Sequence, residues 1–470
     1  MEEIAAKNYK SLFARKYVWL FLGRILPLFA LFVITVIYSR RLNYDEYGTF
    51  QSIWMYANIV NVIVSFGFSS VLLSTNLSFF FYYLKKNKNT IILFYAILSI
   101  VVFAVFFVLA KNFDTTLKLL LITFMIVQNV ITVAETFLIK KHGEKTSFLI
   151  NIFYSLLFLA AYIVVLYTRY SLSLLIFILI VVSVLKLAII SFADKKNKAG
   201  EPAPEEKNFM QHWAYLGLNE ILGVMSRWID KVFLLYLLTA SDFAVFFNGS
   251  FEIPLFGLLI SVAGSFMAIE FSRSLQQKDK ILSLFKETSS LLSSIVFPLF
   301  FFLFFYRHEL FSFIFKNKYN DSVSIFAISI FILPIRINNY SVILQCFSQG
   351  RKVMMGSLID IIIALVLMIL LYPKMGSKGI VLSIVISTYC QIIYYLLNSA
   401  KVLQVSPSQL LPLKKLAIKF LLLLALYFLS FLLLSSLSTI LKLSIAGILT
   451  VIFMIAGTWS YSRIFFKNKS

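Results

Sequence analysis

The chain has 470 residues, of which 60% are hydrophobic and only 14% are charged. Soluble globular domains carry about 25% charged residues, so this composition excludes a soluble fold. The net charge of +22 would suit a nucleic-acid-binding protein, but the positions of the charges exclude that class too, as the loops show below.

Long apolar runs fill the sequence from end to end. A helix that crosses a bilayer needs about 20 mostly apolar residues, and the runs predict about 14 such spans. In chain order we expect them at residues 18–39, 48–74, 90–110, 119–139, 147–168, 171–192, 213–239, 243–269, 288–306, 322–347, 353–372, 379–399, 416–438 and 443–462. The predicted fold class is therefore an all-α polytopic membrane protein.

The basic residues are distributed unequally between the two sets of loops. With the N-terminus placed inside, 26 of the 43 Lys and Arg residues fall in inside segments, 11 in outside segments and 6 within spans. This is the positive-inside bias of membrane proteins, so the charge reflects topology and contact with anionic lipid headgroups rather than a nucleic-acid groove. We expect both termini to be cytoplasmic. We expect no cleavable signal peptide, because the first apolar run has no small-residue cleavage site.

One linker divides the predicted spans into groups. Residues 193–212 are polar and contain prolines, which is typical of a mobile joint. We therefore expect an N-terminal lobe of six spans at 1–192, a C-terminal lobe of six spans at 213–400, and a C-terminal helix pair at 401–470. No segment outside the spans is long enough to hold a core of its own.

A weak internal repeat supports two related lobes. Glu46-Tyr47-Gly48-Thr49-Phe50 follows the first span, and Asp242-Phe243-Ala244-Val245-Phe246 follows the seventh, 196 residues later. Ser65-Phe66-Gly67 stands at nearly the same offset from the stretch Ser261–Gly264. Parallel repeats of this kind place a transport site between two halves that rock. Chance similarity in a chain rich in Phe and Ser is the alternative.

Two stretches resemble a known family. The segment YSRRLNYDEYGTF at 38–50, followed by an Asn-bearing helix that ends Phe66-Gly67-Phe68, resembles the polysaccharide-exporter branch of the multidrug/oligosaccharidyl-lipid/polysaccharide (MATE-like) superfamily, the Wzx-type flippases. Residues 230–238 before Ser241-Asp242-Phe243 are similar to the seventh-span pattern of that family, although Ala244 stands where the glycine of the repeat is expected.

The resemblance implies a fold and a cargo that the composition does not show. It implies two pseudo-symmetric six-helix lobes with an added helix pair. It also implies transport of undecaprenyl-pyrophosphate-linked oligosaccharide, such as an O-antigen, capsule or exopolysaccharide repeat unit, to the outer leaflet of the bacterial inner membrane.

The seventh span is the least lipid-like of the runs. On a helical wheel of about 100° per residue, its polar side chains share one wedge that a lipid-facing helix could not keep. The wedge consists of Asn219, Glu220, Gly223, Ser226, Arg227, Asp230 and Lys231. It must line a wet cavity or a helix interface, and we expect Arg227 and Lys231 to bind an anion. Internal pairing of Asp230 with Arg227, and of Glu220 with another helix, is the alternative.

Two further arginines lie inside predicted spans. Arg24 in the first span precedes Pro27, and either meets a pyrophosphate at a cavity mouth or reaches the inner headgroups by snorkelling. Arg336 lies in the middle of the tenth span after Pro334, where snorkelling is hard. A guanidinium suits phosphate because its planar fork donates paired hydrogen bonds. Arg24, Arg227, Lys231 and Arg336 together are the predicted cationic cavity.

Acidic residues in the runs are candidates for charge balance or ion coupling. Glu220, Asp230, Glu252 and Asp360 form this set. Burial favours the neutral form of a carboxyl group, so Glu252 and Asp360 could exchange protons, or could neutralise a nearby arginine. Glu135 lies beside Lys140 and Lys141, and we expect it only to neutralise.

The remaining polar residues of the runs are expected to be structural. Asn58 and Asn61 should bond helix to helix, and Cys346 and Cys390 should be free buried thiols rather than a disulfide. The three histidines lie in or beside separate loops without metal-ligand spacing. No Walker loop and no Gly-x-Ser-x-Gly elbow occurs, so we expect neither an enzyme nor ATP-driven export. We expect no cofactor, and coupling to an H⁺ or Na⁺ gradient is a prediction.

These observations favour an alternating-access flippase whose partners are a lipid-linked oligosaccharide, membrane lipids and other glycan-assembly proteins. A MATE-type multidrug or cation antiporter is one alternative, but it predicts an acid-dominated cavity rather than an excess of intramembrane cations. A membrane glycosyltransferase or glycan polymerase is a second alternative, which would be expected to carry a larger outside loop.

Overall fold

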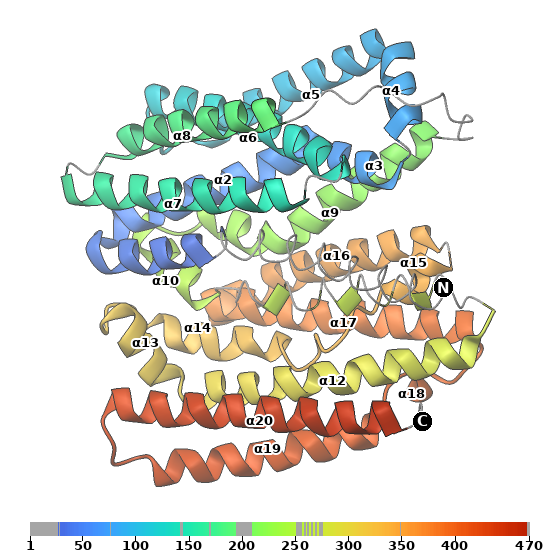
Figure 1. The fold of residues 1–470 in the computed structure, drawn as a ribbon. Coiled ribbons are helices and arrows are strands. Elements are labelled where there is room, and N and C mark those ends of the chain that lie inside the picture. Colours follow the sequence, from blue (N-terminus) through green and yellow to red (C-terminus); the bar gives the residue numbers. More distant parts are fainter. Residues whose placement is uncertain are drawn as a thin grey trace. The chain divides into compact units, whose positions relative to one another are not determined.

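The computed structural model describes residues 27–467 apart from 28, 76, 142–143, 169–170, 194–208, 251–255, 258–259, 261–262, 265–266, 268–269, 272–275 and 348. The secondary structure of this part of the chain is helical, as the apolar runs predict (Figure 1). The contacts divide the chain into two compact units, Met1–Trp228 and Ile229–Ser470. The predicted lobe boundaries at 192 and 213 stay a prediction, since most of the seventh span clusters with the first unit.

The first unit contains eight labelled helices and a helix over residues 29–41. These are α2 (Tyr44–Ser65), α3 (Phe68–Ser74), α4 (Leu77–Lys86), α5 (Lys88–Leu109), α6 (Thr115–Lys140), α7 (Glu144–Thr168), α8 (Leu172–Ala193) and most of α9 (Phe209–Leu235). Helix α8 packs against α6 and α7, and α2 packs against α5 and α6. An aromatic core that includes Phe79, Phe80 and Trp213 joins α3, α4 and the start of α9.

The second unit contains the end of α9 and the rest of the chain. Its elements are α10 (Ala240–Gly249), α12 (Lys278–Phe305), α13 (Arg307–Phe315), α14 (Ser322–Ser329), η1 (Ile330–Ile332), α15 (Val342–Cys346), α16 (Gly350–Met375), α17 (Ser377–Leu403), α18 (Pro407–Leu410), α19 (Leu413–Leu433) and α20 (Thr439–Lys467). Helices α16 and α17 form an extensive pair, and the C-terminal helices α19 and α20 pack on α12 (Figure 1).

The internal repeat has a physical basis in the way two helices begin. Asn43 caps α2: its Oδ1 accepts from the amide of Glu46 at 2.8 Å, and the Glu46 carboxylate accepts from the Asn43 amide at 3.2 Å. Thr239 caps α10, where its Oγ1 accepts from the amide of Asp242 at 3.1 Å. Cap and acid recur at the same offset because both helices start with a side-chain cap three residues before an acid.

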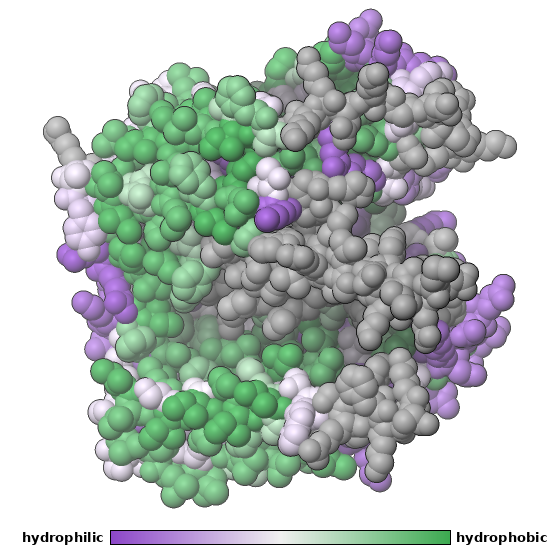
Figure 2. All heavy atoms as spheres, viewed as in Figure 1, coloured by the Kyte–Doolittle hydropathy of each residue, from purple (hydrophilic) through white to green (hydrophobic). Residues whose placement is uncertain are grey.

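Nine helices in the described part of the chain are long and apolar enough to cross a membrane, or ten if α2 and α3 form one bent span. The count of fourteen stays a prediction. Helix α9 is not among the nine, because its polar wedge lowers its apolar content. Hydrophobic residues cover most of the face seen in Figure 2, and hydrophilic residues gather towards helix ends, as lipid contact requires.

Two predicted spans are not continuous helices. The second bends by 51° between α2 and α3, because Phe66 and Gly67 both adopt left-handed backbone conformations, with φ of 39° and 71°. The tenth, expected as one helix over 322–347, breaks after η1, and Leu333–Ser341 are not helical. Pro334 lies at the start of that break, and a proline both lacks the N–H donor of a helix and clashes with the preceding turn.

Candidate functional site

The polar wedge of the seventh span lies on the single continuous helix α9. Its four charged members differ in environment: Arg227 is exposed, Glu220 is half-buried, and Asp230 and Lys231 are buried. Glu220 and Arg227 belong to the first unit, Asp230 and Lys231 to the second. The wedge therefore holds different kinds of charged site rather than one uniform stripe.

Arg227 places a guanidinium group within a predicted span, and the fold does not bury this group. It is exposed, and it makes no hydrogen bond or ion pair with any residue that the structure describes. It lies about 21 Å beyond Trp213 along the helix axis, at 1.5 Å per residue. An ionised group at that depth is costly unless water or an anion meets it. Arg227 therefore has the properties expected of a residue that binds an anionic ligand.

Asp230 and Lys231 form a buried ion pair. Lys231 Nζ lies 3.0 Å from Asp230 Oδ2, with only 9% and 7% of the two side chains exposed. The ammonium also lies 5.8 Å from the ring centre of Phe247 on α10, close enough for a cation–π contact. The structure thus gives Asp230 its partner in Lys231 rather than Arg227, and the charge of Lys231 is already balanced. That Lys231 also binds the transported ligand stays a prediction.

Glu220 lies where the second span bends. It accepts a hydrogen bond from the hydroxyl of Ser70, in the first turn of α3. The bend leaves carbonyl groups without their helical partners, and side chains satisfy two of them: Tyr95 donates to Ser65 O at 3.1 Å, and Trp213 Nε1 donates to Phe66 O at 3.1 Å. Polar atoms freed by a break within a span need such partners. The alternative that Glu220 pairs with another helix is met only by this hydrogen bond to a neutral hydroxyl, so the role of Glu220 stays a prediction.

Arg336 lies in the break of the tenth span. Its backbone amide bonds to Leu333 O at 3.0 Å, and its side chain is half-buried. Asn338 holds the break to α12 by donating to Phe285 O at 3.1 Å and to Ser289 Oγ at 2.6 Å. Non-helical backbone at membrane depth occurs only where it is buried in protein or lines a wet cavity, and Arg336 stands on such a segment.

Of the three remaining residues predicted to form the site, the structure describes one. Asp360 lies on α16 and is 6% exposed, so it is buried as expected. Arg24 and Glu252 lie outside the described residues.

Of the two structural asparagines, Asn61 does bond helix to helix, since it accepts from Asn129 of α6 at 2.7 Å. The same prediction is wrong for Asn58, whose amide donates to Trp54 O within its own helix at 2.8 Å.

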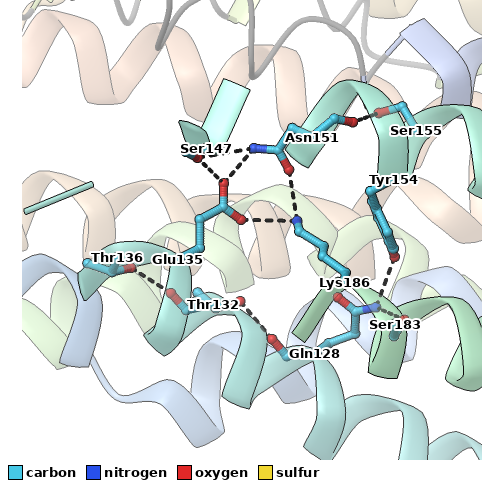
Figure 3. A network of polar contacts seen from close by, with 10 residues as sticks. All are labelled: Gln128, Thr132, Glu135, Thr136, Ser147, Asn151, Tyr154, Ser155, Ser183 and Lys186. Atoms are coloured by element: carbon cyan, nitrogen blue, oxygen red, sulfur yellow. Dashed lines mark hydrogen bonds and ion pairs between the residues drawn. The ribbon is translucent and has the colours of Figure 1, made fainter. Parts of the chain in front are cut away.

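A buried polar network between α6, α7 and α8 was not predicted (Figure 3). Lys186 Nζ lies 3.0 Å from Glu135 Oε2 and 2.8 Å from Asn151 Oδ1. The other carboxylate oxygen of Glu135 accepts from Ser147 at 2.7 Å and from Asn151 at 2.5 Å. Glu135 does neutralise a cation, but the cation is Lys186 rather than Lys140. Lys140 donates to Leu73 O at 2.7 Å instead.

Lys419 is a second lysine within a predicted span for which no role was predicted. Its ammonium donates to Ser290 O, Ser293 Oγ and Ser294 Oγ at 2.8–2.9 Å. It forms no ion pair with the residues that the structure describes. The Lys419 ammonium therefore links α19 to α12 through neutral oxygens, without a counter-ion among the described residues.

The family follows from comparison with known proteins. Residues 37–324, more than half of the chain, match the polysaccharide biosynthesis protein family. The chain belongs to this family. No curated protein matches it in sequence.

Solved structures agree with the family in fold. The chain is similar to the lipid II flippase MurJ in its inward closed conformation, with a TM-score of 0.70, 15% identity, and 97% and 99% of the two chains covered. It is similar to a MOP-superfamily transporter from Pyrococcus furiosus (TM-score 0.58, 11% identity, 83% and 95% covered). It is also similar to a multidrug resistance MATE transporter in an outward-facing conformation (TM-score 0.58, 13% identity, 83% and 95% covered). Family and fold together confirm the resemblance to the polysaccharide branch of that superfamily and a multi-pass membrane protein.

The described part of the chain places both guanidinium and carboxyl groups within predicted spans. No group of three His, Cys, Asp or Glu residues in that part of the chain could hold a metal ion. Cys346 and Cys390 are not joined in a disulfide, as expected, but both are half-buried rather than buried. Arg227 and Arg336 supply guanidinium groups, and Glu220 and Asp360 supply carboxyl groups.

Proposed function

We propose that the chain is an alternating-access flippase for undecaprenyl-pyrophosphate-linked oligosaccharide. It moves an O-antigen, capsule or exopolysaccharide repeat unit from the inner to the outer leaflet of the cytoplasmic membrane, with both of its own termini cytoplasmic. Membership of the polysaccharide biosynthesis family and a fold like that of a lipid II flippase support this proposal. The polyprenyl tail stays in lipid, so the protein needs polar groups only for the pyrophosphate and the first sugars.

The observation that carries the proposal is Arg227. Its guanidinium lies within a predicted span, is exposed, and has no counter-ion among the described residues. A cation at this depth with no counter-ion among the described residues destabilises the empty protein, and a bound anion would remove that cost. A pyrophosphate matches it in charge and in geometry, because guanidinium binds phosphate oxygens in pairs.

Arg336 adds a second cation of a different kind. It stands on a backbone segment that is not helical within the tenth span, and broken helices carry the substrate groups in many transporters. The half-buried position limits snorkelling and favours a ligand that comes to the arginine.

Substitution of Arg227 tests the proposal directly. Purified protein is placed in liposomes, and translocation of undecaprenyl pyrophosphate carrying a fluorescent sugar is followed by quenching from outside. Arg227→Ala should lower the rate about 10- to 100-fold, the cost of one hydrogen-bonded charge. Arg227→Lys should recover only part of it, since an ammonium lacks the fork.

The control is Arg351→Ala, which removes an exposed arginine just before the predicted eleventh span and should leave the rate unchanged. Translocation by Arg227→Ala at the wild-type rate, with normal protein levels, would contradict an anion-binding role. Loss of rate in both variants would show a general effect of lost charge instead.

A second candidate is a MATE-type multidrug or cation antiporter. The fold similarity extends to a multidrug transporter, and Asp230 and Asp360 are buried acids of the kind that such transporters require. Asp230 is neutralised by Lys231, which weakens this candidate. A deletion strain that becomes sensitive to cationic drugs while its glycan export stays normal would favour the antiporter.

A further inference from the structure

Three acidic residues of the spans can be compared by their partners. Glu135 has Lys186 at 3.0 Å, and Asp230 has Lys231 at 3.0 Å. Glu220 forms no ion pair with any residue that the structure describes, and its partner is the neutral hydroxyl of Ser70. Adding a proton to a carboxylate that has a buried lysine beside it leaves an uncompensated positive charge. Adding a proton to Glu220 removes an uncompensated negative charge.

We propose that Glu220 is the proton-binding group of the transport cycle, loaded from water on one side of the membrane and unloaded to the other. This inference rests on the proposed transport function, and it names the ion that drives it. The step is a proton transfer from water to a carboxylate oxygen and back, so it needs no other reactant. The half-buried position of Glu220 keeps the carboxyl group within reach of water.

The hydroxyl of Ser70 can serve both forms of Glu220. A hydroxyl donates to an ionised carboxylate and accepts from a protonated carboxyl group. The hydrogen bond therefore persists in either state, with its direction reversed, and no polar atom is orphaned when the proton arrives. A lysine partner could not do this, because an ammonium has no acceptor.

Ser70 links the proposed proton-binding residue to the bend in the backbone of the second span. Ser70 lies in the first turn of α3, directly after the bend at Phe66 and Gly67. Gly67 is also pressed against α9, since a Cβ on Gly67 would lie 2.7 Å from the amide nitrogen of Gly217. Glu220 is less than one turn further along α9. Protonation of Glu220 thus changes a contact made next to the 51° bend between α2 and α3.

Among the residues that the structure describes, few other charged groups surround Glu220. Tyr95 of α5 is close enough to interact with it electrostatically, but its hydroxyl already bonds to Ser65 O. Lys140 of α6 contacts α3 only at its far end, through Leu73 O. Arg227 is two turns along the same helix, about 10 Å away on the axis. None of them neutralises Glu220 in the way that lysines neutralise the two paired acids.

An infrared titration tests proton binding without any cargo. The carbonyl stretch of a protonated carboxyl group is followed in detergent-solubilised protein from acid to alkaline pH. Glu220→Gln should remove one titrating band, and Ser70→Ala should shift its midpoint while keeping it. The control is Glu287→Gln, since Glu287 also accepts from a serine, Ser283 Oγ at 2.9 Å, but lies before the predicted ninth span. It should leave the band unchanged.

Transport in liposomes tests the coupling. Wild-type protein should translocate undecaprenyl pyrophosphate carrying a fluorescent sugar several-fold faster with a proton gradient than without one, and Glu220→Gln should give the same rate in both conditions. A Glu220→Gln variant that still responds to the gradient like the wild type overturns the inference. So does a spectrum in which Glu220→Gln and the wild type titrate alike.

The outcomes separate this inference from the proposed function. Translocation by wild-type protein that ignores the gradient refutes proton coupling and leaves the flippase intact. Absence of translocation by wild-type protein counts against the flippase, while the infrared titration still decides whether Glu220 binds a proton. Glu220→Asp should restore the response to the gradient if the carboxyl group itself is required.

Discussion

Removing Lys186 should strand a buried carboxylate, and the cost can be worked out from the network in Figure 3. Lys186→Met keeps most of the apolar length of the side chain but removes the ammonium 3.0 Å from Glu135. Only 8% of Lys186 and 20% of Glu135 are exposed. Breaking a buried pair from one side typically costs about 3–5 kcal/mol. Ser147 and Asn151 still donate to the carboxylate, so the lower end of this range applies.

Protonation of the stranded carboxyl group sets an upper limit to this cost. With a reference pKa of about 4.3 for glutamate, neutralisation costs about 3.7 kcal/mol at pH 7 and about 1 kcal/mol at pH 5. Lys186→Met should therefore lower the free energy of unfolding by about 3 kcal/mol at pH 7 and by about 1 kcal/mol at pH 5. The sign follows because the folded variant then binds more protons than the unfolded chain, so its stability rises as the pH falls.

The assay is unfolding of the solubilised protein by titration with SDS at both pH values. The double variant Glu135→Gln/Lys186→Met should recover most of the loss, because no charge is then left unpaired. Lys419→Met is a matched control, since Lys419 has no carboxylate partner among the described residues; loss of its bonds to three buried serines should cost about 1–3 kcal/mol, equally at pH 5 and pH 7. Equal losses at pH 5 and pH 7 in Lys186→Met, or a double variant no better than the single one, would refute the reasoning.

Two further substitutions test the breaks in the spans by the same titration. Gly67→Ala should lower the free energy of unfolding by more than about 2 kcal/mol, because a left-handed alanine costs about 1–2 kcal/mol and its Cβ would lie 2.7 Å from the backbone of Gly217; Gly447→Ala, with no atom within 4 Å, should cause no loss, and equal effects would contradict the prediction. Asn338→Ala should cost about 1–3 kcal/mol, because its two acceptors on α12 are buried with it. Asn398→Ala removes only a bond within its own helix and should cost less than about 0.5 kcal/mol; similar losses at both asparagines would show that the contact with α12 is unimportant.

The features that depend on composition and on helical periodicity could be predicted from the sequence. Helices over most of the apolar runs, the polar wedge of α9 and the related starts of α2 and α10 all follow from apolar content, helical spacing and capping. The capping acids Glu46 and Asp242 could be recognised because a cap acts within one turn of chain. The family resemblance rested on the same stretches, which is why it held.

The breaks could not be predicted from apolar content. The second and tenth spans are apolar enough on average that a hydropathy pattern shows each of them as one helix. The left-handed conformation of Phe66 is imposed by tertiary contacts, namely the packing of Gly67 on Gly217 and the bond from Trp213. In the tenth span Pro334 was visible, but a proline alone does not distinguish a kink from a break. The ties that Asn338 makes to α12 decide it.

The pairing of Glu135 with Lys186 was missed for a different reason. The two residues are far apart in sequence, and no periodicity links charges on separate helices. Depth was the signal that could have found the pair: Glu135 and Lys186 lie about 6 and 9 Å from the inner ends of the predicted fourth and sixth spans. Opposite charges at similar depth in one lobe should be treated as partners first. The same rule would have assigned Lys231 to Asp230.

The ion pairs inside the spans show which charged residues have no counter-ion among those that the structure describes. Where an acid and a lysine are joined inside the spans, the pair carries no net charge and has no reason to change its proton. Arg227 and Glu220 are left on one helix, about 10 Å apart along its axis. An anion held at Arg227 is repelled by an ionised Glu220 by about 1.7 kcal/mol at an effective dielectric constant of 20, and protonation removes that repulsion. By linkage the anion must favour the proton as much as the proton favours the anion. Comparing the infrared midpoint of Glu220 with and without inorganic pyrophosphate measures this coupling. Helix α9 can therefore load proton and cargo together without any contact between the two.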